Sequence, residues 1–377
     1  MKTSRRSYPH VMPTKIGFVL VSGPAHAIPS TRIAVLNMLP YLEAAGFAPH
    51  ILHGPEADTH NPDVGHLEQK ILDEGFEIVV FQKVFGPSAL RLARSLRSRG
   101  VRTVFLVCDF VLPDMAEATD LTIVVTEHLK SLYPPELRGR IRVVHDGVER
   151  LDERVNPVRP ITGSKDAPLR AVLVTSASLD RMPVLRRIPE WLSVEIVGAY
   201  SGSWSAQLRR DWWQFQQLSS WDRRLRFLRF ASDRRLTRTP WGPDEVYRRM
   251  KQADIGIIPI EPDSERDPRA LWRVKSENRL TLMMAMGLSV VATPIPAYEA
   301  VVRQGVDGFL APDEQTFIKS LNALRDPVMR ETVGANARQT ALSRYSIALQ
   351  AERLIAALGE LSRSTTDSMS ASFTGSI

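Results

Sequence analysis

The sequence predicts an α/β protein with two domains, each built on a doubly wound, Rossmann-like parallel sheet, and a cleft between the domains. Apolar, strand-like runs alternate with helical patterns in both halves of the chain, and the alternation stops only between 151 and 168. Fully apolar strands that alternate with helices are typical of parallel sheets covered on both faces. A length of 377 residues also exceeds what one ordinary hydrophobic core requires.

The first domain is expected over 14–155, behind a flexible N-terminus at 1–13. Ser30 is a suitable N-cap for a helix that ends at Ala45, because Gly46 follows as a stop signal. The expected strands cover residues 15–21, 49–52, 77–81, 101–107, 121–125 and 141–144.

A linker is expected at 156–168, because Pro157, Pro160 and Gly163 interrupt regular structure there. The second domain then extends over 169–345 with the same alternation of strands and helices. Its expected strands cover residues 169–174, 194–197, 225–230, 255–259, 290–292 and 309–310.

The C-terminus is expected to contain one more helix, at 346–361. Ile347, Leu354 and Leu358 lie on one side of that helix and need a surface to cover. Residues 362–377 are rich in Ser and Thr and carry little apolar surface, so we expect a disordered tail.

The chain is basic, with a formal net charge of +7 and a pI of about 9.7. Nucleic acid, a phosphorylated small molecule and an anionic membrane surface all suit this charge, and charge alone does not choose among them. No pattern resembles a helix-turn-helix or an aromatic RNA platform, so no nucleic-acid partner is expected. The eight histidines and one cysteine show no metal-ligand spacing, so no metal is expected.

Cys108 lies inside an apolar run that starts at Val104, so we interpret it as a core thiol. A single cysteine forms no intrachain disulfide and is compatible with a reducing compartment. No long apolar stretch follows the basic N-terminus, so no secretory signal is expected. We therefore expect a cytoplasmic protein, and peripheral contact with a membrane stays open.

The strongest functional signal lies between Lys275 and Glu299. A helix is expected to begin near Ser276, with Asn278 in its first turn, and its free N–H groups and dipole suit a pyrophosphate. Lys275 adds a positive charge at this helix start. Glu299 follows a strand end at a proline-rich loop, where a carboxylate is placed to bind both hydroxyls of a ribose. The structural alternatives are that Ser276 only caps a helix beside Lys275, and that Glu299 is a solvated surface acid.

Four motifs follow one another in this half of the chain. They are Ala253-Asp254-Ile255-Gly256-Ile257-Ile258-Pro259, Gly287-Leu288-Ser289-Val290-Val291-Ala292-Thr293, Glu299-Ala300-Val301-Val302 and Asp307-Gly308-Phe309-Leu310. No single motif is diagnostic, but their order and spacing are specific as a series. The series resembles the C-terminal domain of GT-B glycosyltransferases related to family 4, and the resemblance extends over about 15–361.

The resemblance implies a GT-B fold whose second domain binds the nucleotide and whose last helix packs back on the first domain. It implies a retaining, hexosyltransferase-type enzyme that moves a sugar from a nucleotide-sugar donor to a glycan, lipid-linked or small-molecule acceptor, without a metal or other cofactor. Lys275 and the helix start would stabilise the departing diphosphate. Ser276, Asn278 and Glu299 complete the expected donor site.

The chain departs from the family pattern at one place. The family has two glutamates separated by seven residues, and the aligned positions hold Val274 and Leu282. A subset of related sequences resembles Lys-Ser-x-Asn-Arg at this helix start, which matches residues 275–279. An epimerase, a phosphorylase and a non-catalytic nucleotide-binding protein therefore remain alternatives. Candidates for a nearby acid are Glu261, Asp263 and Glu265.

Candidates elsewhere are less specific. Ser22 and Gly23 follow the first strand and are expected to face the acceptor or the cleft, with a simple turn as the alternative. His26 in the same loop is a catalytic candidate that would polarise a substrate hydroxyl, and Arg32 at the next helix start is a cleft candidate. Arg181, after the first strand of the second domain, is a candidate phosphate ligand. No Gly-x-Gly-x-x-Gly follows the first strand, which argues against a nicotinamide cofactor.

Tryptophans and arginines gather between 204 and 229. This combination suits docking to a membrane surface. The helical spacing of Leu208, Trp212, Phe215 and Leu218 favours instead a face that is buried in the core.

Overall fold

The chain forms two units in the computed structural model, which describes residues 12–175, 188–260 and 272–373. The first unit comprises Met1–Val144 together with Ile347–Ile377, and the second comprises His145–Ser346. The expected linker at 156–168 therefore lies inside the second unit. The chain passes from the first unit to the second earlier, between Val144 and His145. Among the described residues, no helix is long and apolar enough to cross a membrane.

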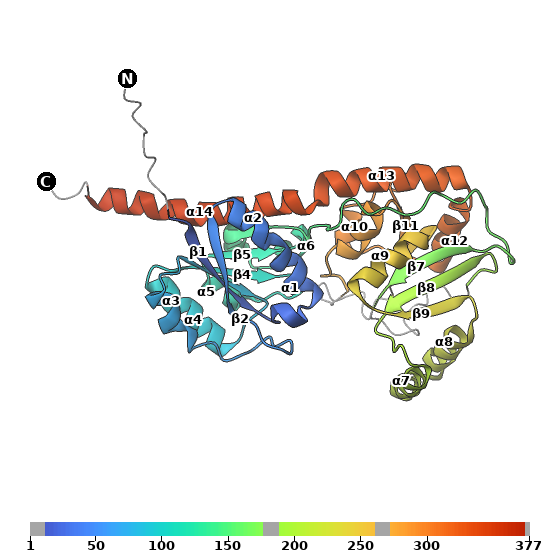
Figure 1. The fold of residues 1–377 in the computed structure, drawn as a ribbon, viewed down its shortest axis with the longest axis horizontal. Helices are drawn as coiled ribbons and strands as arrows, with labels where there is room; N and C mark the ends of the chain where they lie inside the picture. The colour runs from blue at the N-terminus through green and yellow to red at the C-terminus, as the bar shows by residue number, and fades with distance from the viewer. Residues whose placement is uncertain (1–11, 176–187, 261–271, 374–377) are drawn as a thin grey trace, which may run out of the picture. The chain divides into compact units, whose positions relative to one another are not determined.

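The first unit is built on six parallel strands in the order β2-β1-β3-β4-β5-β6 (Figure 1). All residues of β3 and β5 are buried, as expected for a sheet with helices on both faces. The strands are β1 (Thr14–Leu20), β2 (Phe47–His53), β3 (Ile78–Gln82), β4 (Arg102–Val107), β5 (Leu121–Val124) and β6 (Ile141–Val143).

The helix expected at 30–45 is divided into three pieces. Pro40 explains the break, because it has no N–H group and its ring would clash with the carbonyl of Leu36 in a continuous helix. The stop at Gly46 is confirmed by its left-handed backbone, with φ of +87°. The first-unit helices are α1 (Pro29–Ala34), a 3-10 turn (Leu36–Met38), α2 (Leu39–Ala44), α3 (Leu67–Asp73), α4 (Pro87–Ser98), α5 (Pro113–Ala118) and α6 (Glu127–Ser131).

The last helix, α14 (Ile347–Phe373), completes the core of the first unit. Its buried Leu354 and Leu358 belong to one apolar cluster with Met38 and Leu42. The helix extends beyond Leu361, where we expected a disordered tail to begin. Adding a residue to an existing helix requires no new nucleation, so a polar composition alone does not end it.

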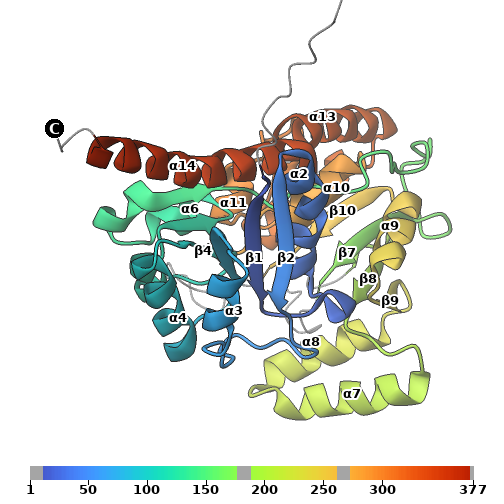
Figure 2. The same cartoon turned by 60° about the vertical axis from the view of Figure 1, so that its left-hand side comes forward.

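The second unit is also built on six parallel strands, in the order β12-β11-β10-β7-β8-β9 (Figure 2). The strands are β7 (Leu169–Val174), β8 (Leu192–Gly198), β9 (Leu236–Pro240), β10 (Ile255–Ile258), β11 (Ser289–Ala292) and β12 (Phe309–Leu310).

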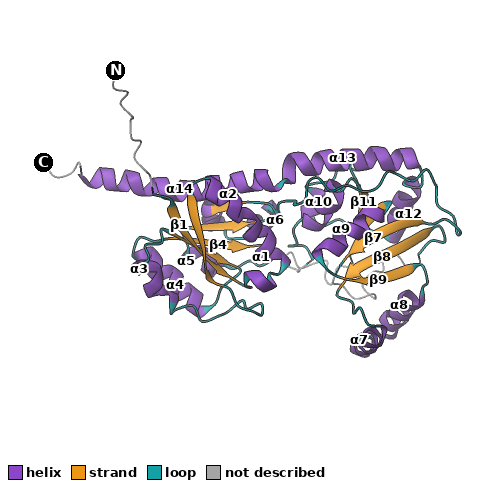
Figure 3. Ribbon diagram, in the orientation of Figure 1, coloured by secondary structure: helices purple, strands orange, loops and turns teal. Residues whose placement is uncertain are grey.

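Helices cover both faces of this second sheet (Figure 3). Val172 belongs to one core cluster, whereas its neighbours Ala171 and Leu173 belong to the other, as strand alternation requires. The helices are α7 (Trp204–Gln217), α8 (Trp221–Ser232), α9 (Pro243–Gln252), α10 (Asn278–Ala285), α11 (Pro296–Glu299), α12 (Glu314–Ala323) and α13 (Pro327–Tyr345).

The strand expected at 225–230 is wrong, because this segment lies inside α8. The Ser220 hydroxyl caps the helix by accepting a hydrogen bond from the Arg223 N–H, and Phe227 and Phe230 are buried on one face. Their spacing of three fits a helix, although the alternation of arginine with apolar residues resembled a strand.

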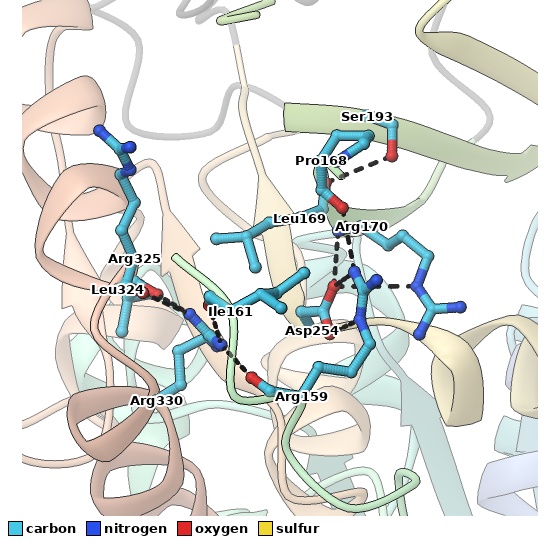
Figure 4. Close-up of polar contacts among 10 residues, drawn as sticks. All are labelled: Arg159, Ile161, Pro168, Leu169, Arg170, Ser193, Asp254, Leu324, Arg325 and Arg330. Carbon is cyan, nitrogen blue, oxygen red and sulfur yellow. Dashed lines mark hydrogen bonds and ion pairs between the residues drawn. The ribbon is translucent and has the colours of Figure 1, made fainter. Parts of the chain in front are cut away.

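Residues 156–168 are bound to the body of the second unit rather than forming a free linker (Figure 4). Asp254 accepts hydrogen bonds from the Arg159 guanidinium and, at 2.7 Å, from the Arg170 backbone N–H. Asp254 thereby ties this segment to the start of β7.

Arg330 of α13 forms the second attachment (Figure 4). Its side chain is 2% exposed, and its guanidinium donates to the carbonyl oxygens of Arg159 and Ile161 at 2.7 and 2.8 Å. The same group donates to the carbonyls of Leu324 and Arg325, both at 2.8 Å. One buried cation therefore satisfies four backbone acceptors from two segments.

Candidate active site

The strand order of the second sheet reverses between β7 and β10, which are neighbours. In a doubly wound sheet, ligands bind outside the carboxyl ends of the strands at such a reversal. The loops that follow β7 and β10 continue into 176–187 and 261–271. Arg181, Glu261, Asp263 and Glu265 therefore lie outside the described residues.

The helix expected to start near Ser276 is α10, and it begins at Asn278. Lys275 is exposed just before it. Ser276 is not its N-cap, because the Ser276 hydroxyl donates a 2.6 Å hydrogen bond to Asp146 Oδ2. The structure thus brings Lys275, Ser276 and Asn278 together at one helix start, next to the mostly buried carboxylate of Asp146.

Glu277 and His145 form the inner layer of this helix start. Glu277 is only 1% exposed, and its Oε1 lies 2.8 Å from His145 Nδ1. The His145 ring packs edge-on against Tyr345 at the end of α13, with ring centroids 5.1 Å apart. The first two residues of the second unit, His145 and Asp146, therefore hold the N-terminus of α10 in place.

Glu299 is the exposed last residue of α11, directly after the buried Tyr298. Burial raises the pKa of Tyr298, and the charges of Arg279 and Glu277 act on it in opposite directions. Tyr298 belongs to the same core cluster as Leu280 and Met283, so α11 packs close to α10. The Thr293 hydroxyl accepts a 2.9 Å hydrogen bond from the Ile260 N–H, which joins the ends of β11 and β10.

The two positions where the family pattern has glutamates are part of the packed interior. Val274 is buried, and Leu282 packs against the core cluster that contains Met283 and Tyr298. Burying an unpaired carboxylate at either position would be unfavourable. Glu277 is the carboxylate nearest in sequence to Val274, and it faces His145.

The first-unit candidates differ in exposure. The Ser22 hydroxyl is fully buried, lies 2.8 Å from the Thr31 hydroxyl and accepts a hydrogen bond from the Ile28 N–H. A Cβ on Gly23 would lie 2.7 Å from the Gly54 carbonyl oxygen, so this glycine permits a close backbone contact. These contacts give Ser22 and Gly23 a structural role.

His26 and Arg32 lie farther along the same segment. His26 is exposed in a 3-10 turn (Pro24–His26), and Arg32 is half-buried in α1. Both residues belong to the first unit, whereas Lys275 and Glu299 belong to the second.

Sequence reasoning missed Lys83, at the carboxyl end of β3. Its buried ammonium lies 2.8 Å from Asp109 Oδ1, which follows β4. Burial lowers the pKa of Lys83, but Cys108 and Asp109 outweigh burial and raise that pKa above its usual value. Cys108 is half-buried rather than a fully enclosed core thiol. No local motif marks Lys83, whose left-handed backbone, with φ of +55°, appears only in the structure.

Comparisons with known proteins agree with this architecture. Residues 177–326 match the family model for Glycosyl transferases group 1. No curated protein matches the sequence.

Solved structures match over nearly the whole chain. A glycosyltransferase from Rickettsia africae is 11% identical, with 93% of this chain and 99% of that chain covered and a TM-score of 0.65. HepE from Anabaena, solved in complex with UDP, is 14% identical, with 92% and 100% covered and a TM-score of 0.63. Sucrose-phosphate synthase from Thermosynechococcus elongatus is 16% identical, with 94% and 100% covered and a TM-score of 0.61.

Identities this low show a shared fold, and the family model matches residues 177–326, a part of the second unit. The two parallel six-stranded sheets are those of the GT-B fold. Residues 177–326 therefore resemble a Glycosyl transferases group 1 domain, and the chain as a whole has the GT-B fold.

Proposed function

We propose that the chain transfers a hexosyl group from a nucleotide-sugar donor to a glycan, lipid-linked or small-molecule acceptor, with retention at the anomeric carbon and without an essential metal. The observation that supports this most strongly is the exposed Lys275 at the N-terminus of α10, within the matched family domain. HepE binds UDP and UDP-glucose, so UDP-glucose is the first donor to test.

The proposed role of the helix start is electrostatic. Free N–H groups at the start of α10 and the Lys275 ammonium would stabilise the diphosphate as it departs. Ser276 and Asn278 would line this site, and Glu299 would hold the ribose hydroxyls from α11. A cationic helix start takes the role that a divalent metal plays elsewhere, and the chain contains no Asp-x-Asp metal-binding pair.

The experiment is a donor screen in the presence of excess chelator, followed by NMR of the anomeric proton of the product. We expect transfer with retained configuration under these conditions. An inverted product, or activity that chelator abolishes and magnesium restores, would contradict the proposed mechanism.

A non-catalytic nucleotide-binding protein is the second candidate, favoured by the apolar packing of Val274 and Leu282. It predicts intact nucleotide binding with neither transfer nor hydrolysis of any donor. Calorimetric titration alongside the donor screen separates the two candidates.

A further inference from the structure

The helices α7 and α8 form a hairpin with an unusual number of exposed apolar side chains. Among the described residues of α7, none is buried. Trp204 and Trp212 are 77% and 61% exposed, and Leu208 between them is exposed as well. The expectation that Leu208 and Trp212 face the core is therefore wrong, and of that set only Leu218 is buried.

The helix α8 has two apolar faces. Phe227 and Phe230 belong to the core of the second unit. Trp221, which is 71% exposed, Leu225 and Leu228 form a second stripe that faces solvent. A helix that only packs on a sheet needs one apolar face, so the second stripe calls for another partner.

The two helices lie side by side (Figure 2), with the ring centroids of Phe215 and Phe227 6.5 Å apart. Trp212 stacks on Phe215, with centroids 5.8 Å apart. The Arg224 guanidinium lies over the rings of both Phe215 and Trp221, at 5.4 and 5.2 Å. We call this the α7–α8 surface, and it comprises Trp204, Leu208, Arg209, Arg210, Trp212, Trp213, Trp221, Leu225 and Leu228.

The charge of the hairpin is strongly one-sided. Residues 204–232 contain six arginines, two aspartates and no lysine or glutamate. Both aspartates are engaged in ion pairs, Asp211 with Arg238 at 2.7 Å and Asp222 with Arg226 at 3.0 Å. The hairpin therefore presents net positive charge beside its exposed tryptophans.

We propose that the α7–α8 surface docks on a bilayer that contains anionic lipid. Tryptophan rings are suited to the boundary between acyl chains and head groups, and arginines are attracted to the anionic head groups. A second copy of the chain is a poorer partner, because it would bring two arginine-rich surfaces together. This inference is independent of the proposed transferase activity.

The test is co-sedimentation of the full chain with vesicles of phosphatidylcholine, alone or mixed with phosphatidylglycerol. We expect binding to the mixed vesicles with a blue shift of tryptophan emission. The triple variant Trp212→Ser, Trp221→Ser, Leu225→Ser should bind about tenfold more weakly or worse, because insertion of these side chains provides the apolar part of the affinity.

A matched control is the triple variant Val306→Ser, Val328→Ser, Met329→Ser, which removes exposed apolar side chains elsewhere in the second unit. This control should bind like the parent. The variant Arg209→Gln, Arg210→Gln should lose part of the preference for phosphatidylglycerol, since it removes two of the six arginines of the hairpin.

The proposal is overturned if the parent fails to bind the mixed vesicles, or if the tryptophan variant binds as the parent does. A concentration-dependent dimer in light scattering that the tryptophan variant abolishes, without vesicle binding by the parent, would identify a second copy as the partner instead.

Discussion

Lys275 is the side chain with the most direct expected effect on ligand binding. A charge-assisted hydrogen bond to phosphate contributes about 1.5–3 kcal/mol. Lys275→Ala should therefore raise the Kd for UDP or GDP about tenfold or more, because that energy corresponds to at least one decade in affinity. Isothermal titration calorimetry measures this change directly.

Lys319→Ala is the matched control, because Lys319 is an exposed lysine on α12 of the same unit. The control should bind nucleotide like the parent. If Lys275→Ala and the parent bind the nucleotide with equal affinity, Lys275 is not part of the binding site.

Tyr133 makes a pH-dependent contribution to the stability of the first unit. Burial raises its pKa from 10.0 to about 12. The folded state thus holds the phenol proton more tightly than the unfolded state. The contribution is complete below pH 10.0 and is lost as the pH rises to about 12. A shift of that size corresponds to about 3 kcal/mol.

The variant Tyr133→Phe isolates this effect. Near neutral pH it should be less stable than the parent by about 1 kcal/mol, since it loses the hydroxyl that accepts from the Leu112 N–H. That difference should shrink and then reverse as the pH approaches 12. Urea unfolding at a series of pH values measures it, with Tyr41→Phe, at a half-buried tyrosine, as the control. A difference that stays constant with pH would contradict the assignment.

The candidate site was predictable only where its residues are neighbours in sequence. Lys275, Ser276 and Asn278 were assigned to one helix start from local pattern. The bond between Ser276 and Asp146 joins residues 130 positions apart, and nothing local indicates it. The same limit applies to Ser22, whose burial depends on how the loop after β1 folds back onto Thr31.

At the scale of elements, the attachment of 156–168 depends on Arg330. Arg330→Met would leave four backbone carbonyls without their donor in a buried site, which should cost about 3 kcal/mol or more. For a unit of this size the melting temperature should fall by about 6–12 °C. Calorimetry of the purified variant provides the measurement.

Arg325→Met is the control for this prediction. Arg325 donates to the carbonyls of Thr162 and Gly163, but it is half-buried, so water can replace its hydrogen bonds. Its effect should be below about 1 kcal/mol. Equal melting temperatures for the two variants would show that the hydrogen bonds from Arg330 to the buried carbonyls do not stabilise the attachment of 156–168.

The helix α8 shows that the pattern of apolar and polar residues does not always distinguish a helix from a strand. The α8 segment alternates apolar and basic residues, and this pattern fits a strand as well as a two-faced helix. An ordinary core helix has one apolar face, whereas α8 has a second, exposed apolar stripe. The strand prediction for this segment failed because that stripe belongs to a surface with a separate partner.

At the scale of the molecule, the GT-B fold was predicted because fully apolar strands recur at regular intervals. The division of the chain was placed too late, since prolines at 156–168 suggested a linker although buried polar contacts fix that segment. Breaker residues report local backbone preference, whereas a unit boundary depends on long-range contacts.

Removing the last helix should unfold the first unit selectively. A chain that ends at Ser346 lacks the buried Leu354 and Leu358, each of which contributes about 1.5–3 kcal/mol. Limited proteolysis should then cut within 14–144 while 188–260 stays protected. A chain that ends at Leu361 should resist proteolysis like the parent.

The full-length variants Leu354→Ala and Leu358→Ala test the same contribution of α14 if the shorter chain is insoluble. Each should lower the free energy of unfolding by about 2–5 kcal/mol. Ile318→Ala, at a half-buried residue of the second unit, should leave the first unit unaffected. Identical protease patterns for both truncated chains would show that α14 is dispensable.

The placement of α14 has a consequence for synthesis on the ribosome. The six strands of the first unit leave the ribosome before any strand of the second, yet the helix that covers Met38 and Leu42 is made last. Domains ordinarily fold in order from the N-terminus. Here the second unit is complete once Ser346 has emerged, and the first waits with apolar surface uncovered. We expect nascent chains of that length to bind chaperones through the earlier-made unit, and to release them when the final helix arrives.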